Sequence, residues 1–290
     1  MPAMTTPTPR EARRCYHALH PVHAAYYFAP EHDDAYAALG LERGPMAYLA
    51  GRAAPLGPVG PGAVVAMFYN FQPALVARHL PRAWQVAAPE RVLVARLRIV
   101  DACLRRLLGP DALASREVAE AASLALRAAE GCGRPARPLY SANADLPVPD
   151  TPHLALWHAG TLLREHRGDG HLMALSAAGL DGLEALVTHS ATGTGWKPRY
   201  LQANRGWSAA DWAAAQKRLR ERGLLRDDGE LTERGMELRR SIEAETDRLD
   251  LAPYRHLGAA GTRRLTELAG PLGKAVLAGD GLPLAHLGKG

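Results

Sequence analysis

Residues 219–235 have the sequence LRERGLLRDDGELTERG, which separates two stretches of helical pattern. Before it, Ser208 provides an N-cap for the segment AADWAAAQKRLRERG, and after it a long helical pattern runs from Glu233 to Leu251. Between the helices, two short extended pieces flank the Asp-Gly pair at 228–229, a pair typical of tight turns between strands. This order predicts a helix, a small two-stranded wing at 224–232 and a second helix.

The same string resembles the end of a winged-helix domain of the MarR type. In such domains a helix ends in Arg-Gly, a leucine-rich strand enters the wing, and Leu-Thr-x-x-Gly opens the next helix, as at residues 231–235 here. The resemblance implies a mainly α fold, with a helical N-terminal half and a C-terminal winged-helix domain.

The helix that follows Ser208 is poorly suited to DNA. A recognition helix presents polar side chains to base edges from its N-terminal turns. Here those turns are Ala209-Ala210-Asp211-Trp212 followed by three more alanines, and the basic residues come late. Residues 226–230 of the wing contain one arginine and three acids, whereas phosphate contacts require the reverse. We therefore favour a structural winged helix, and a MarR-like DNA-binding transcriptional regulator with a ligand pocket is the alternative.

The composition is that of a globular protein. The chain has 290 residues, of which 47% are hydrophobic and 22% charged, and this excludes a disordered or fibrous protein. Its 35 Lys and Arg residues exceed its 30 Asp and Glu residues, and the isoelectric point near 9.3 permits nucleic-acid binding without requiring it. The three cysteines have no disulfide or zinc spacing, and no apolar run reaches the roughly 18 residues of a membrane span. We expect a cytoplasmic protein without membrane association.

Two domains are expected. Residues 1–150 form a helical N-terminal domain that ends in a Pro-rich strap, and residues 151–290 form the winged-helix-like domain. We interpret the strap, residues 134–152, as an ordered extended segment that joins the halves. The first twenty residues lack an apolar stretch and are interpreted as a frayed arm.

Helix signals dominate elsewhere. Pro89 and Gly109 bound one expected helix, and Ser115 caps the next, which ends near residue 130. The apolar run at 63–71, AVVAMFYNF, fits a buried strand or a helix equally well, because periodicity does not decide between them.

The highest concentration of ionisable residues lies at 164–171, Arg-Glu-His-Arg-Gly-Asp-Gly-His, where six of the eight residues are ionisable. Three interpretations compete. The first is a solvated helix end with surface ion pairs. The second is a metal site from His166, Asp169 and His171, although their spacing matches no standard ligand pattern. The third, which we favour, is an acid/base and anion-binding site with carboxylate bases and arginine clamps.

This string, together with EHDDAYAALGL, YLAGRAAPLGPV, FYNFQP and NRGWSAADW, resembles an actinobacterial helix-turn-helix family found in natural-product clusters. The resemblance extends over nearly the whole chain, roughly Tyr16 to Leu282. It implies an enzyme of natural-product biosynthesis that performs acid/base-assisted substitution or ring closure. Some relatives are associated with aziridine formation after a sulfotransferase has activated a hydroxyl.

These arguments lead to a set of expected roles. The expected catalytic residues are Glu165, His166, Asp169 and His171, and the expected substrate-binding residues are Arg52, Tyr69, Asn70, His158, Arg164, Arg167 and Trp207. Glu31, Asn143 and Arg205 are further polar groups that line the same pocket in this interpretation. We expect a cyclase or lyase without metal or cofactor. Its partners would be a small molecule with an anionic group and a sulfotransferase-like protein or a second copy of the chain, with DNA less favoured.

The geometry of this site is also predicted. We expect two helices, Pro152–Arg167 and Gly170–Ala178, joined by a turn at Gly168-Asp169-Gly170. His158, Glu165, Asp169 and His171 should then face one cavity that Tyr69-Asn70-Phe71 closes. Buried acids of this kind must pair with arginines and histidines, whereas the first interpretation requires solvent-exposed side chains.

Overall fold

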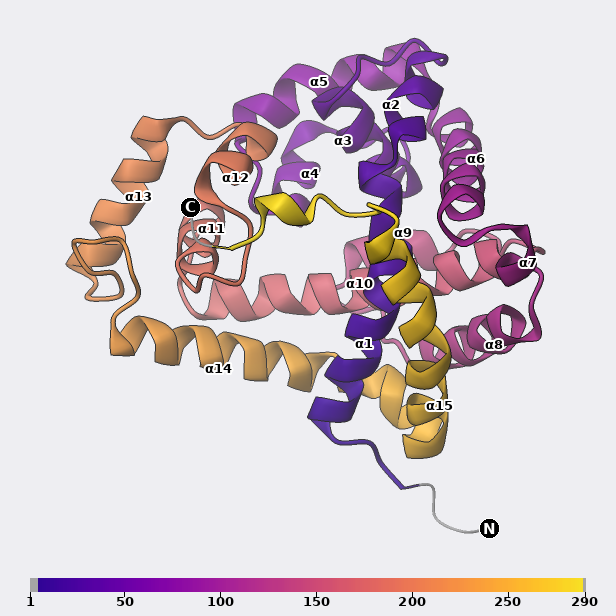
Figure 1. Ribbon diagram of the computed structural model, residues 1–290. Coiled ribbons are helices and arrows are strands. Elements are labelled where there is room, and N and C mark those ends of the chain that lie inside the picture. The colour runs from indigo at the N-terminus through magenta and orange to yellow at the C-terminus, as the bar shows by residue number, and fades with distance from the viewer. Residues whose placement is uncertain (1–4, 289–290) are drawn as a thin grey trace.

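The computed structural model describes residues 5–288 and is mainly helical, as expected (Figure 1). Its α-helices are α1 Pro9–Ala24, α2 Pro30–Ala37, α3 Pro45–Ala53, α4 Pro61–Phe68, α5 Pro73–Val86, α6 Pro89–Leu108, α7 Pro110–Leu113, α8 Arg116–Glu130, α9 Pro138–Ala144, α10 Pro152–Ala177, α11 Gly182–Ser190, α12 Pro198–Arg205, α13 Ala209–Glu221, α14 Glu233–Leu249 and α15 Leu251–Ala278. Three short 3-10 helices, Ala25–Phe28, Ala54–Leu56 and Leu284–His286, complete the described elements. No helix in this part of the chain combines the length and apolarity of a membrane span.

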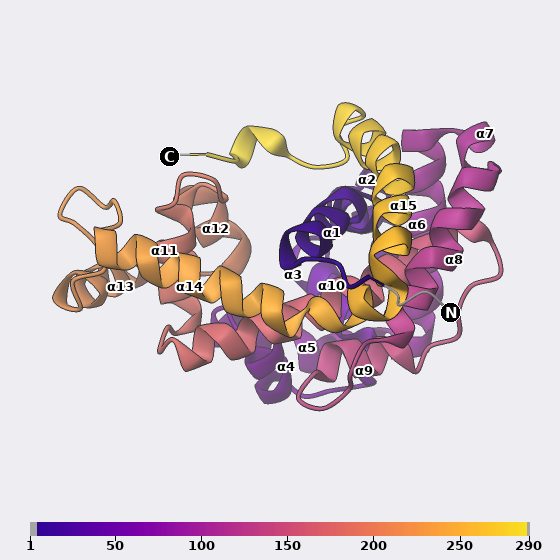
Figure 2. The same cartoon turned by 90° about the horizontal axis from the view of Figure 1, so that it is seen from below.

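Helix α10 lies at the centre of the molecule. It packs against α1, α8 and α9, and its second half runs beside α14 (Figures 1 and 2). Helix α1 packs along α15, so the two ends of the chain enclose α10 together. One hydrophobic core is built from α1, α8, α10 and α15, a second from α2, α3 and α6 with Trp157, and a third from the end of α10 with α11–α14.

The expected helix ends are confirmed where local chemistry sets them. Helix α6 begins at Pro89 and stops at Gly109, whose φ of 77° is accessible to glycine. The Ser115 and Ser208 hydroxyls accept from backbone N–H groups in the first turns of α8 and α13. The run at 63–71 is helical up to Phe68.

The expectation of a frayed N-terminal arm is wrong from Pro9 onward. Thr8 and Glu11 form a capping box at the start of α1, and proline occupies its first position. The helix then buries Cys15 and Leu19 against α10 and α15. Residues 1–4 of the expected arm lie outside the described part.

The expected turn at Gly168-Asp169-Gly170 is also wrong, because α10 continues through it to Ala177. Neither glycine has a positive φ angle. A Cβ atom at Gly170 would lie 2.9 Å from Nη1 of Arg137, so this glycine admits a close neighbour rather than a turn.

Two extended segments are also shorter than expected. The strap contains the helix α9, Pro138–Ala144. In the wing, residues 225 and 231 form a single isolated bridge, and no two-stranded sheet is present among the described residues. The reason is length, because the chain turns at Gly229 and Thr232 already caps α14. The winged-helix assignment is therefore unconfirmed.

Candidate functional site

The segment 164–171 is buried inside the molecule. Glu165 and His166 are each 1% exposed and Asp169 is 3% exposed, so the interpretation as a solvated helix end is wrong. Successive residues of a helix point about 100° apart, and consecutive side chains therefore meet different neighbours. The charged side chains of this segment therefore contact residues of α3, α9 and α14 and the residue at the start of α15.

Glu165 faces α3. Its carboxylate accepts from Nε and Nη2 of Arg52 at 3.3 and 3.2 Å and from Nη1 of Arg164 at 2.6 Å. Burial raises the pKa of Glu165, but Arg164 and Arg52 outweigh burial and bring the pKa to about 2. Glu165 is thus a permanent anion that holds two guanidiniums, which makes it a poor proton acceptor.

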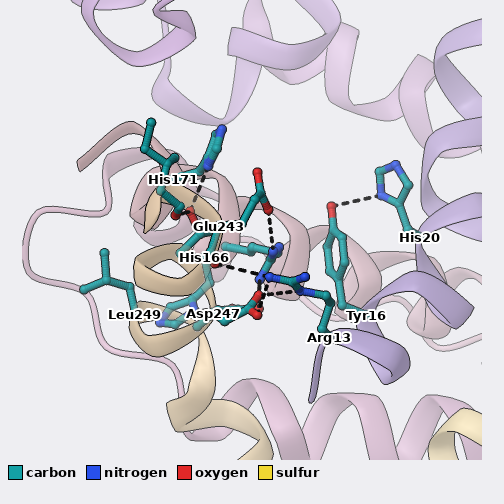
Figure 3. A network of polar contacts seen from close by, with 12 residues as sticks. Arg13, Tyr16, His20, His166, His171, Glu243, Asp247 and Leu249 are labelled. Carbon is teal, nitrogen blue, oxygen red and sulfur yellow. Dashed lines mark hydrogen bonds and ion pairs between the residues drawn. The ribbon is translucent and has the colours of Figure 1, made fainter. Parts of the chain in front are cut away.

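His166 and Arg167 face α14 and α15. His166 Nδ1 lies 3.1 Å from Asp250, and Arg167 lies 2.9 Å from Asp247 and 3.5 Å from Asp250. Arg13 of α1 also contacts Asp247, at 2.5 Å. Figure 3 shows Arg13, Glu243 and Asp247 converging on this chain of ion pairs. Each buried charge on this face has an opposite charge beside it.

Asp169 points toward α9. Its carboxylate accepts from the backbone N–H of Tyr140 at 3.0 Å. Burial raises the pKa of Asp169 to about 6, although this hydrogen bond opposes the shift. Asp169 and Tyr69 line one cavity of about 580 Å³, as expected for these two residues.

The other residues expected around that cavity, His158, Glu165 and His171, do not line it. His171 contacts Thr246 of α14 at 2.8 Å, and burial lowers its pKa to about 4. His158 is 3% exposed, and burial brings its pKa to about 4 as well. The single cavity expected for His158, Glu165, Asp169 and His171 is therefore not formed. His166, Asp169 and His171 do not form a metal site, and no three His, Cys, Asp or Glu side chains within residues 5–288 could hold a metal ion.

Further polar residues serve as links between elements. Trp207 Nε1 donates to the backbone oxygen of Asn70 at 2.9 Å, and the Tyr69 hydroxyl donates to the backbone oxygen of Leu180. Glu31 pairs with Arg106 at 2.7 Å on the surface. The buried amide oxygen of Asn143 accepts from Arg96 at 3.3 Å.

A different cavity is lined by arginine and aromatic side chains. It has a volume of about 400 Å³, and we call it the arginine–aromatic cavity. Its guanidiniums are those of Arg164 and Arg205, and its aromatic walls are Tyr27, Phe28, Tyr48, Phe71, Trp196 and Tyr200. These residues come from the 3-10 helix Ala25–Phe28, from α3, α10 and α12, and from the loops before α5 and α12, so distant segments of the chain build it.

Arg205 has no carboxylate partner in this cavity. Its guanidinium lies 4.4 Å from the Phe71 ring centre, its Nε atom is buried without a hydrogen-bond partner, and burial lowers its pKa. The one carboxylate on the cavity wall, Asp33, is 40% exposed and bonded to His32. Arg52 and Arg164 share the buried carboxylate of Glu165, whereas no acid lies beside Arg205. Positive potential is left in the cavity.

The positive charge around the cavity changes the pKa of Tyr48. Burial raises the pKa of a phenol, yet Arg52, Arg205 and Arg164 bring the pKa of Tyr48 below its ordinary value. The sequence analysis did not select Tyr48, Tyr200 or Trp196, and it treated Arg205 only as a peripheral group. A signal was present in the helical spacing of Tyr200, Ala203 and Asn204, all of which line the cavity.

The surface of α13 is weakly charged. A turn through Gly206, with φ of 77°, joins α12 to α13 in the manner of a helix-turn-helix. The exposed residues of the first turns of α13 are alanines. Arg218 and Arg222 donate to Glu184 at 2.9 and 2.8 Å, so acids of the same unit neutralise them.

Comparison with known proteins places most of the chain in one family. The sequence model described as "Helix-turn-helix family" matches residues 12–283. No curated protein matches the chain, and no solved structure matches it either.

Proposed function

The chain belongs to the helix-turn-helix family, and from its arginine–aromatic cavity we propose that it is a small-molecule enzyme. Its substrate carries an anionic group, and the reaction is an acid/base-assisted substitution or ring closure. The resemblance of the string at 164–171 supports a place in natural-product biosynthesis, after a sulfotransferase-like partner.

One observation carries the proposal, namely that the half-buried Arg205 has no carboxylate partner and that its buried Nε atom has no hydrogen bond. A buried donor without an acceptor costs free energy unless a ligand supplies one. Arg164 lines the same cavity, so two guanidiniums are available to one sulfate or phosphate group. The aromatic walls exclude water around that group and strengthen its attraction to the cations.

The chemistry is an intramolecular displacement. A substrate amine attacks the neighbouring carbon, the C–O bond to sulfate breaks, and sulfate departs with the bonding electrons. Arg164 and Arg205 stabilise the charge that develops on the departing oxygen. Tyr48 accepts the proton lost by the nitrogen, and the neighbouring arginines, which lower the pKa of its phenol, favour the deprotonated form that this step requires. Glu165 keeps Arg164 and Arg52 in position.

Release of inorganic sulfate from 2-aminoalkyl hydrogen sulfates tests this function. We expect the wild-type chain to release sulfate and the corresponding aziridine faster than buffer alone. The variant Arg205→Leu should lose at least about tenfold in rate, the equivalent of 1.4 kcal/mol. Arg199→Leu is the matched control, because Arg199 is exposed on the same helix and does not line the cavity. Equal rates for wild type and Arg205→Leu would contradict the proposal.

A second candidate function is a DNA-binding regulator whose ligand occupies the same cavity. The family membership and the α12–Gly206–α13 arrangement favour it. The neutral face of α13 and the paired arginines behind it weigh against it. A gel shift with the DNA upstream of the gene separates the two candidates. The regulator should retard that DNA at low salt and release it steeply as salt rises.

A further inference from the structure

A larger cavity, of about 820 Å³, lies between α1, the end of α11, the wing and α14. We call it the wing cavity. Pro9, Leu231, Met236 and Ala244 contribute apolar surface to its walls. Its basic residues are Arg13, Arg239 and Arg240. A cavity with a largely apolar wall and a few convergent polar groups is the usual form of a small-molecule site.

Arg239 is the unusual residue of this wall. It is 5% exposed, and one nitrogen, Nη2, donates to Glu243 at 3.1 Å. Its Nε and Nη1 atoms are buried and have no hydrogen-bond partner. Buried donors are almost always satisfied in folded proteins, so two unsatisfied nitrogens on one cation point to a missing acceptor.

The acids of the wing cavity are occupied elsewhere. Asp247 pairs with Arg13 and Arg167, and Glu230 pairs with Arg226 at 2.6 Å. Glu243 is 38% exposed and also lies 3.7 Å from Arg167. The charge of Arg239 is therefore only partly compensated.

The neighbouring histidines are consistent with this excess of positive charge. Burial lowers the pKa of His171 to about 4, and Arg239 adds to that effect while Glu243 opposes it. Burial and Arg239 also lower the pKa of His189, which lines the wing cavity. Both imidazoles are neutral near pH 7, so neither competes with Arg239 for an anion.

We propose that the wing cavity binds a small amphipathic carboxylate. Its apolar body lies against Leu231 and Met236, and its carboxylate accepts hydrogen bonds from the guanidinium of Arg239. The site is independent of the arginine–aromatic cavity and of the reaction proposed there. Because its walls join the wing and α14 to α1, an occupant holds the wing against the body of the protein.

Calorimetric titration of the full chain with 2-naphthoate tests this site, with 2-naphthamide as the neutral ligand of the same shape. We expect naphthoate to bind the wild type and Arg239→Leu to weaken that binding by about tenfold or more, since one charge-assisted contact of about 1.4 kcal/mol or more is lost. Arg240→Leu is the matched control. Arg240 lines the same cavity but is exposed, so we expect a change of about twofold or less.

Two further variants separate the cavities and guard against misfolding. Arg205→Leu disables the arginine–aromatic cavity, and naphthoate should still bind this variant through Arg239. Met236→Trp introduces an indole into the wing cavity while retaining Arg239, and it should abolish binding with the melting temperature preserved. The proposal is overturned if naphthamide binds as tightly as naphthoate, if Arg239→Leu binds normally, or if Arg205→Leu alone removes binding.

Discussion

The two faces of α10 treat buried charge in opposite ways. Toward α3, Arg52 and Arg164 share the carboxylate of Glu165, and Arg205 lies in the same region without an acid beside it. Toward α14, Arg167 meets the carboxylates Asp247 and Asp250, and the His166 ring contacts Asp250 as well. The balanced face ties four helices together, whereas the unbalanced face leaves positive potential in a cavity. In the proposed function, one helix therefore contributes stability through its balanced face and anion binding through the other.

Removing a carboxylate from the balanced face should have the largest effect. Asp250→Ala removes the buried carboxylate that His166 and Arg167 share, and only Arg167 keeps another acid, Asp247, so we expect the free energy of unfolding to fall by about 3 kcal/mol. Urea denaturation measures the change. Glu120→Ala is the control, because it breaks an exposed pair with Arg264 at 2.7 Å and should cost about 0–1 kcal/mol. Similar losses for the two variants would contradict the distinction drawn between buried and exposed pairs.

Two carboxylates four residues apart on α10 should respond to pH with opposite signs. The pKa of Asp169 rises from 3.8 to about 6 on folding, so the folded chain binds more protons in that range and loses stability as pH rises through it. The loss amounts to about 3 kcal/mol. Asp169→Asn should therefore be more stable than wild type at pH 8, with the gain disappearing by pH 4.

Glu165 provides the comparison for this prediction. Its pKa falls from 4.5 to about 2, so the stability that it contributes is present above pH 4.5 and is lost as pH falls toward 2. Glu165→Gln should be less stable than wild type at pH 8. Thermal melts of both variants between pH 3 and pH 8 measure the two trends, and the same sign for both variants would refute them.

The smallest effect on stability is expected at Arg205. Arg205→Leu removes a half-buried cation that has no carboxylate partner, so the free energy of unfolding should stay constant or rise by about 1 kcal/mol. Arg167→Leu, on the balanced face, should lower it instead. Denaturation of the two variants side by side measures this contrast. A clear loss of stability in Arg205→Leu would mean that its charge is compensated in the folded chain and would weaken the proposed anion site.

Local chemistry allowed much of the secondary structure to be predicted. Prolines at helix starts, hydroxyl caps such as Ser115 and Ser208, and Gly109 at a helix end act within one turn of the chain. The α1 capping box of Thr8 and Glu11 was present in the sequence as well, but it was overlooked because the segment lacks a long apolar run.

The continuity of α10 illustrates what local signals leave open. A glycine in a sequence can indicate either a tight turn or a position where another group packs closely against the backbone. Gly170 is of the second kind, because the guanidinium of Arg137 lies against it. That guanidinium comes from the segment before α9, more than thirty positions away. No pattern within residues 164–171 contains this information.

The mainly helical fold and the concentration of charge at residues 164–171 are both readable in the amino-acid sequence. Which of those charges are neutralised is visible only in the folded chain, because their partners lie far away in the sequence. Arg52 and Asp250 are 113 and 85 positions from Glu165, and Arg205 gains its role from aromatic rings of α3 and of the segment before α5. Pairing depends on distance in space, and a helix sends adjacent residues toward different neighbours.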